Sequence, residues 1–175
     1  MGDGSTMYGA DEGNAHVGSF KSFFEHNAQG YNGSIQAEIG NVMASYSAIN
    51  WLPMAISPLL STVLRNTLKF DGFVISDYME IDKLIDQQLP TDFQKFEEVD
   101  EAIATTMNAG VDMMMIPSKG DFQDYIEGVK SALNNHTLPM DRLNDAVARI
   151  ISVKLALGVA KLQQPEDSHI RFRPE

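Results

Sequence analysis

The chain has 175 residues, 43% of them hydrophobic and 21% charged, a composition typical of a folded domain and unlike that of a disordered chain. Its net charge of −11 argues against nucleic acid as the main partner, because phosphate binding requires clustered Lys and Arg. No apolar run reaches the roughly 20 residues of a membrane span, so no membrane partner is expected. The absence of cysteine excludes disulfides and zinc–thiolate sites.

Segments with apolar residues at helical spacing alternate along the chain with short apolar runs. A first helix is predicted over residues 27–38, ending near Gly40. Three short and nearly continuous apolar runs, bounded by Gly or Pro, are predicted to be parallel strands covered on both faces. They are residues 42–46, 73–76 and 111–116.

Further helices are predicted between and after these strands. Apolar side chains recur along one face in each of the segments 58–68, 98–108, 122–133 and 141–157. Gly158 suits the left-handed position that closes a helix. This alternation of strands and helices is typical of βα units with right-handed crossovers.

The predicted fold class is α/β. Three parallel strands leave two exposed sheet edges, which natural proteins normally protect. A complete (β/α)8 TIM barrel has eight strands and about 250 residues, so the sequence predicts a partial barrel made of the later βα units. We expect this domain to extend over residues 1–160, and residues 161–175 to form a polar C-terminal tail or linker.

Polar and aromatic residues end the first two predicted strands, where active sites gather in α/β proteins. Tyr46 ends the first strand, and Ser76-Asp77-Tyr78 ends the second. A carboxylate flanked by aromatic rings suits a sugar site, because a carboxylate can accept sugar hydroxyls or attack an anomeric carbon. An equally good alternative from position alone is that Asp77 is only the N-cap of a helix, a position that favours Asp.

Two other polar regions have simpler interpretations. Residues 71–101 hold ten Asp or Glu and only two Lys, which predicts mainly a solvated face. The Gly-rich and acidic opening, residues 2–14, is predicted to be a surface loop, because it lacks the Gly-Lys-Ser/Thr ending of a phosphate loop. None of the four histidines has a partner at metal-ligand spacing, so no metal site is expected.

Several longer motifs closely resemble glycoside hydrolase family 3, the β-glucosidase and exo-glucanase type. Residues 42–82 contain VMASY, LLSTVLR and FDGFVISDY, which are similar to the family's VM-x-SY, LL-x-x-x-LR and FDGFV-x-SDW. The opening GDGST and GADEGN look like the loop after the family's Lys-His pair. AGVDMMMIP and MDRLNDAVARIISVKLALGV look like the last barrel strand and its closing helices. The resemblance covers residues 2–160.

The resemblance implies roles for individual residues. Asp77 matches the family's catalytic nucleophile, and Tyr78 stands where the family usually has a Trp that borders the glucose subsite. Tyr46 matches a tyrosine near the nucleophile. Glu12 falls where some members have a glutamate that lines the substrate pocket, a weaker match. Lys83 stands where some members have an Arg, and no role is carried over to it.

The resemblance also implies a reaction, a retaining hydrolysis of terminal β-D-glucosyl residues without any metal or organic cofactor. Its substrate would be a carbohydrate, a β-glucoside, and a second carboxyl group about 5–5.5 Å from the nucleophile would protonate the leaving oxygen. In this subfamily that acid/base usually lies on a following domain, and the Lys-His pair would precede Gly2. The missing barrel half and the downstream acid/base domain are therefore the expected partners, and the chain is expected to be inactive alone.

Alternatives remain open at this stage. Trp51 replaces the family's usual Gly after Asn50, which supports a non-catalytic or decayed sugar-binding homologue. A β-N-acetylhexosaminidase is a further alternative, although such members carry Ser-Asp-Asp or Ser-Asp-Ala where this chain has Ser76-Asp77-Tyr78. Family members are often secreted, periplasmic or vacuolar, and no secretory signal is visible at this N-terminus.

Overall fold

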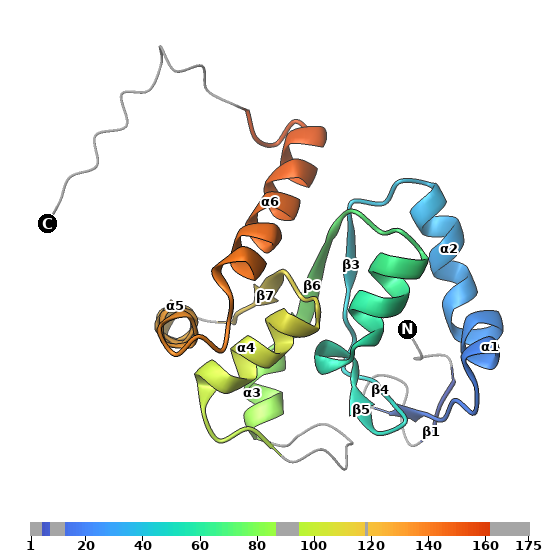
Figure 1. Cartoon of the computed structure of the whole chain (residues 1–175), viewed down its shortest axis with the longest axis horizontal. Coiled ribbons are helices and arrows are strands. Elements are labelled where there is room, and N and C mark those ends of the chain that lie inside the picture. Colours follow the sequence, from blue (N-terminus) through green and yellow to red (C-terminus); the bar gives the residue numbers. More distant parts are fainter. Residues whose placement is uncertain (1–4, 8–12, 87–94, 118, 162–175) are drawn as a thin grey trace, which may run out of the picture.

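The computed structural model describes residues 5–7, 13–86, 95–117 and 119–161. These residues form two small β-sheets surrounded by helices (Figure 1). Parallel strands alternate with helices along the chain, so the fold class is α/β, as the sequence predicts. None of the described helices is both long enough and apolar enough to cross a membrane.

A three-stranded parallel sheet forms the centre of the fold. It consists of β3 (Asn41–Met43), β6 (Phe73–Tyr78) and β7 (Met113–Met115), in the order β3-β6-β7. The three predicted strands are thereby confirmed, with different ends. The strand β6 extends two residues further than predicted, which places Asp77 and Tyr78 inside the strand.

Three consecutive helical segments precede β3. They are α1 (Phe20–Phe23), η2 (Phe24–Ala28), which has π-type hydrogen bonds, and α2 (Gln29–Gln36). The helix predicted over residues 27–38 is confirmed as the later part of this run. It ends at Gln36 because the chain soon turns away through Glu38, whose φ of 58° is left-handed and incompatible with a continuing helix.

The other four predicted helices are also confirmed. Gly158 has the positive φ, 69°, that the sequence predicts after the last of them. The helices are η4 (Leu60–Thr67), which again has π-type hydrogen bonds, α4 (Val99–Ala109), α5 (Lys119–Asn134) and α6 (Met140–Ala156).

A second, four-stranded sheet was not predicted from the sequence. Each of its strands has two residues, too few to show an alternating pattern. Its last two strands are joined by a tight turn in which Asn50 and Trp51 both have positive φ, 50° and 67°. The strands are β1 (Thr6–Met7), β2 (Asn14–Ala15), β4 (Ala48–Ile49) and β5 (Leu52–Pro53), in the order β1-β2-β4-β5. The short η3 (Met54–Ile56) and α3 (Glu80–Ile85) were also not predicted.

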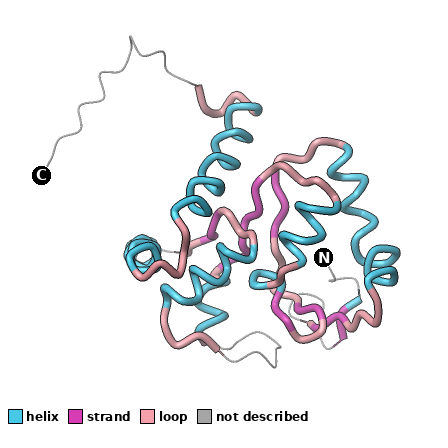
Figure 2. The backbone as a smooth tube through the Cα atoms, in the orientation of Figure 1, coloured by secondary structure: helices cyan, strands magenta, loops and turns pink. Residues whose placement is uncertain are grey.

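Two clusters of buried apolar side chains form the core. The first lies between η4, the helices before β3 and the sheet, and includes Phe23, Leu60, Leu64 and Val74. The second lies among α3, α4, α5 and α6, and includes Ile81, Ile103, Met107 and Leu138. Met114 of β7 packs against both clusters, so the sheet joins them. Figure 2 shows the parallel strands between these two groups of helices.

A buried ion cluster holds the starting ends of β6 and β7. The side chain of Asp112 is 0% exposed and pairs with both Arg65 and Arg142. The N–H of Val74 donates a hydrogen bond of 2.7 Å to the same carboxylate. Arg65 also donates to the carbonyl of Gly72 at 3.0 Å. The cluster therefore ties η4 and α6 to the loops that lead into the sheet.

The parallel sheet has the form of a barrel segment. Among the described residues, β3 and β7 each have one strand neighbour and lie at the sheet edges, with β6 between them. Three βα units of this kind correspond to part of a (β/α)8 barrel, which confirms the predicted partial barrel. Residues 162–175 lie outside the described residues, so the predicted domain boundary at residue 160 stays a prediction.

Candidate active site

The C-terminal ends of the parallel strands gather several polar groups at one end of the sheet. In Figure 1 this is the end of β6 that leads into α3, opposite the end near α2. Asp77 and Tyr78 are the last two residues of β6. Tyr46 follows β3 by three residues, and Lys83 lies on α3 directly after β6.

Asp77 does not cap the helix that follows it. The first residue of α3 is Glu80, its N-cap is Met79, and no side chain caps it by a hydrogen bond. The carboxylate Oδ1 of Asp77 instead accepts the N–H of Tyr78 at 2.7 Å. The cap interpretation is therefore wrong, and the half-buried Asp77 carboxylate is held at the strand end by its own backbone.

Ser76 fixes the backbone on which Asp77 stands. Its buried Oγ accepts the N–H of Met115 at 2.9 Å and donates to the carbonyl of Asp77 at 2.8 Å. The N–H of Met79 donates to the carbonyl of Met115 at 3.2 Å. These bonds bridge an irregularity in the pairing of β6 with β7 between Ile75 and Tyr78. The strand end is thus pinned to β7 although the regular ladder is interrupted there.

Tyr46, Tyr78 and Lys83 are brought together beside Asp77. The hydroxyl of Tyr46 donates a hydrogen bond to the backbone carbonyl of Tyr78. The ammonium of Lys83 lies 3.7 Å from the centre of the Tyr46 ring, a close cation–π contact. The side chain of Tyr78 is 48% exposed and presents its ring at the surface. The structure therefore assembles three of the four expected site residues, and adds Lys83 to them.

Glu80 is a member of this cluster that the sequence does not indicate. It is 1% exposed, and neither carboxyl oxygen has a hydrogen-bond partner among the described residues. Burial, and then the nearby Asp77 carboxylate, raise the pKa of Glu80 to about 8, while Lys83 lowers it. The prediction of a solvated acidic face is thus wrong at Glu80. The sequence signal for this burial is that Glu80 lies four residues before the apolar Leu84, which places both side chains on one face of the helix.

Of two further residues named in the sequence analysis, the structure describes only Trp51. Glu12 falls outside the described residues, so its predicted place at the pocket stays a prediction. Trp51 lies on the turn between β4 and β5, where its backbone N–H donates a hydrogen bond to the side-chain Oδ1 of Asn14 at 2.6 Å. Its φ of 67° is a conformation that Gly adopts freely, which explains why Gly suits this position in the family pattern.

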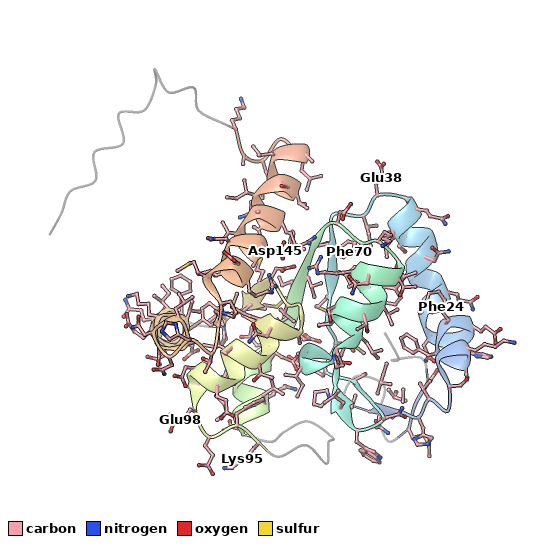
Figure 3. All side chains as sticks on the ribbon, in the orientation of Figure 1. Phe24, Glu38, Phe70, Lys95, Glu98 and Asp145 are labelled. Atoms are coloured by element: carbon pink, nitrogen blue, oxygen red, sulfur yellow. The ribbon has the colours of Figure 1, made fainter. Side chains whose placement is uncertain are left out.

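A cavity of about 370 Å³ at the other end of the sheet is separate from this cluster. It is lined by the chain around Gly40, by Phe70 and Gly72, by Val153 of α6 and by Leu157 directly after that helix. Figure 3 labels Phe70 and Glu38, both of which line this cavity. Because active sites of α/β folds lie at the C-terminal strand ends, we place the candidate site at Asp77.

The arrangement supports covalent chemistry by a carboxylate. No group of three His, Asp or Glu in the described part of the chain has the geometry of a metal site. Asp77 is partly accessible, backbone-held and flanked by aromatic rings. A retaining mechanism needs a second carboxyl group about 5–5.5 Å away that can reach the leaving oxygen. Glu80 is a carboxyl group close enough for Asp77 to raise its pKa, but Glu80 is buried and therefore not exposed to a leaving oxygen.

Comparisons with known proteins agree on one family. Residues 1–153 match the model of the glycosyl hydrolase family 3 N terminal domain. The lysosomal beta glucosidase of Dictyostelium discoideum is 32% identical over 124 residues, covering 70% of this chain and 14% of the relative. The periplasmic beta-glucosidase of Salmonella typhimurium is 28% identical over 157 residues, covering 87% of this chain and 19% of the relative.

A solved structure shows the same fold. The exo-1,3/1,4-beta-glucanase (ExoP) of a Pseudoalteromonas species superimposes with a TM-score of 0.76 at 29% sequence identity. The match covers 96% of this chain and 20% of that chain. This chain therefore spans 14% to 20% of the length of these three relatives.

Proposed function

We propose, from the premise that this chain belongs to glycosyl hydrolase family 3, that it supplies the nucleophile of a retaining β-glucosidase-like reaction on terminal β-D-glucosyl residues. The observation that carries the proposal is the position of Asp77. Its carboxylate is half-buried at the C-terminal end of β6, is held by the N–H of Tyr78, and has Tyr46 and Lys83 beside it. The β-glucosidase names of the relatives support a β-glucoside as the substrate class.

The proposed reaction has two steps at the anomeric carbon. In the first, an Asp77 carboxylate oxygen bonds to that carbon, while the bond to the leaving oxygen breaks and a general acid protonates the leaving oxygen. In the second, water attacks the same carbon, the acid group now acts as base for the water proton, and the Asp77 carboxylate leaves. Neither step requires a cofactor.

Three residues support Asp77 in distinct ways. The exposed ring of Tyr78 offers an apolar face for the sugar. Tyr46 acts as a positioning residue, because its hydroxyl holds the carbonyl of Tyr78 and with it the end of β6. Lys83 places a positive charge over Tyr46 and lowers the pKa of the neighbouring Glu80. We further propose that Glu12 lines the substrate pocket, as the family pattern suggests.

We propose that the acid/base carboxyl comes from a segment outside these 175 residues, and that the chain is not competent for turnover alone. The support is the buried state of Glu80, together with the small share of the relatives that this chain spans. The expected partners are the rest of a barrel and a domain that carries the acid. Robust hydrolysis of nitrophenyl β-glucoside by this chain alone, lost in Asp77→Asn, would overturn this part of the proposal.

A labelling experiment tests the nucleophile without any need for the acid. A 2-deoxy-2-fluoro-β-glucoside with a dinitrophenolate leaving group needs no protonation of that group, so Asp77 alone can displace it. We expect intact-mass spectrometry to show one fluoroglucosyl group per chain, located on the peptide that contains Asp77. The label should be absent in Asp77→Asn and present in the matched control Asp141→Asn, an exposed residue of α6. A label that persists in Asp77→Asn would refute the assignment.

A second candidate, a sugar-binding homologue without turnover, is not favoured by the relatives described above, which carry the names of glycoside hydrolases. It rests on the partly exposed Trp51, which replaces the family's Gly at the left-handed turn between β4 and β5. Calorimetry with glucose would then show binding while the fluoroglucoside leaves no label. The β-N-acetylhexosaminidase alternative is not favoured, because the relatives described above are β-glucosidases and an exo-glucanase.

A further inference from the structure

The buried carboxyl group of Glu80 has no part in the reaction as proposed so far. It lies three residues after Asp77, beyond the left-handed Met79, whose φ is 57°. Both of its carboxyl oxygens are buried and have no hydrogen-bond partner in the described part of the chain. An unpaired buried carboxylate is very costly, whereas the protonated acid avoids most of that cost. The position therefore calls for a specific role.

We propose that Glu80 is a proton-bearing positioning residue for Asp77, and that its ionisation follows the covalent state of the Asp77 carboxylate. The proposal stands on the burial of both Glu80 carboxyl oxygens without a partner among the described residues, at the start of the helix that follows Asp77. The link to a covalent state rests on the proposed function of Asp77 as a nucleophile. In the free chain Glu80 is neutral, so that Asp77 can carry the single negative charge of the pair.

The charges that face Glu80 define this pair. They are Asp77 of β6, which favours the protonated form, and Lys83 of α3, which favours the ionised form. The helix α4 packs against α3, but its Asp100 accepts a hydrogen bond of 2.6 Å from Ser131 on α5, and its Glu101 is exposed. Burial and the Asp77 carboxylate raise the pKa of Glu80 to about 8, which agrees with a protonated group at neutral pH.

Esterification of Asp77 removes one of the two causes that keep the proton on Glu80. When an Asp77 oxygen bonds to an anomeric carbon, the carboxylate becomes a neutral ester and its negative charge disappears. Glu80 then becomes more acidic and releases its proton to solvent more readily. When water cleaves the ester, the charge returns to Asp77 and Glu80 binds a proton again. The protonated leaving group departs when the ester forms and the free sugar departs when water cleaves it, so Glu80 itself exchanges only a proton with solvent.

NMR titration of the full chain with ¹³C-labelled glutamate tests the pair directly. The Glu80 carboxyl signal is assigned by its absence in Glu80→Gln. We expect its midpoint near pH 8, far above the ordinary glutamate value of 4.5. In Asp77→Asn and Asp77→Ser, which are neutral like the ester, the proton affinity of Glu80 should fall roughly tenfold. Asp141→Asn, a surface control, should leave the midpoint unchanged.

Two outcomes would overturn the proposal. One is a Glu80 midpoint in the acidic range of the exposed glutamates. The other is an unchanged midpoint in whichever neutral Asp77 variant retains the native amide spectrum. The fluoroglucosyl adduct provides a second measurement, and its Glu80 midpoint should fall as in Asp77→Asn. Failure of labelling together with a shifted midpoint would reject the nucleophile and keep the pair. Labelling together with an unshifted midpoint would keep Asp77 as the nucleophile and reject its pairing with Glu80.

Discussion

At the scale of single residues, the buried Glu80 makes the stability of the chain depend on pH. Its pKa is raised from 4.5 to about 8 in the folded state. Between these pH values the unfolded chain releases the proton and the folded chain keeps it, so stability falls as pH rises. Glu80→Gln removes this loss. We expect the variant to be more stable than the parent by on the order of 4 kcal/mol at pH 8, and not below pH 4.5.

Urea denaturation between pH 4 and pH 8 measures this difference. Glu101→Gln, which changes an exposed glutamate on α4, is the matched control and should follow the parent at every pH. A parallel pH profile for Glu80→Gln and the parent would contradict the prediction, since it would mean that Glu80 titrates alike in the folded and unfolded chains.

The sequence indicated which candidate residues would lie together, but not their environment. Asp77, Tyr46 and Tyr78 could be named from strand ends and from family motifs, and the structure places all three together. Neither source indicates the left-handed Met79, because a positive φ at a non-Gly residue depends on tertiary contacts. That one residue sets the direction of the chain into α3, and with it the burial of Glu80.

At the scale of secondary-structure elements, the ion cluster around Asp112 is the feature with the largest expected effect on stability. Asp112→Ala leaves the guanidinium groups of Arg65 and Arg142 partly buried without their anion, and removes the acceptor of the Val74 N–H. Loss of one partner of a buried pair costs about 3–5 kcal/mol. We expect a loss of that size by urea denaturation, with little dependence on salt.

The exposed ion pair between Lys130 and Glu127 on α5 provides the comparison. Lys130→Ala should cost less than about 1 kcal/mol, because solvent screens such pairs. Equal effects of Asp112→Ala and Lys130→Ala would show that the buried cluster does not hold the strand starts.

Long elements were predictable and short ones were not. Helices such as α4 and α6 have enough turns to show a regular apolar face, and β6 is a continuous apolar run. The two-residue strands β1, β2, β4 and β5 pair segments that are up to 34 residues apart, as Asn14 and Ala48 are, and no local pattern encodes such pairing. The sequence thus predicted the parallel sheet and its helices, and missed the small sheet beside them.

At the scale of the whole molecule, an apolar strip on α6 stands in solvent. Val147 is 44% exposed and Ile151, one turn later, is 45% exposed. We expect the isolated chain to self-associate at high concentration through this strip. Ile151→Glu should weaken association roughly tenfold, since it replaces apolar area worth about 1.4 kcal/mol by a charge. Sedimentation velocity over a range of concentrations measures the change.

Gln123→Glu, which adds the same charge at an exposed position of α5, away from this strip, is the control for a general effect of charge. It should associate as the parent does, and both variants should unfold at the same urea concentration as the parent, as is usual for exposed positions. If the parent sediments as a monomer at every concentration, the strip is not an association surface.

The position of the ion cluster also bears on how such a chain can change over time. Asp112 bonds to Val74 at the start of β6, whereas Asp77 stands near the end of the same strand. The residues that secure the fold and the residues of the proposed sugar site therefore form separate sets at opposite ends of one sheet. Substitutions at the end of the proposed site can accumulate while the anchoring end preserves the fold, which makes this architecture a tolerant starting point for directed evolution.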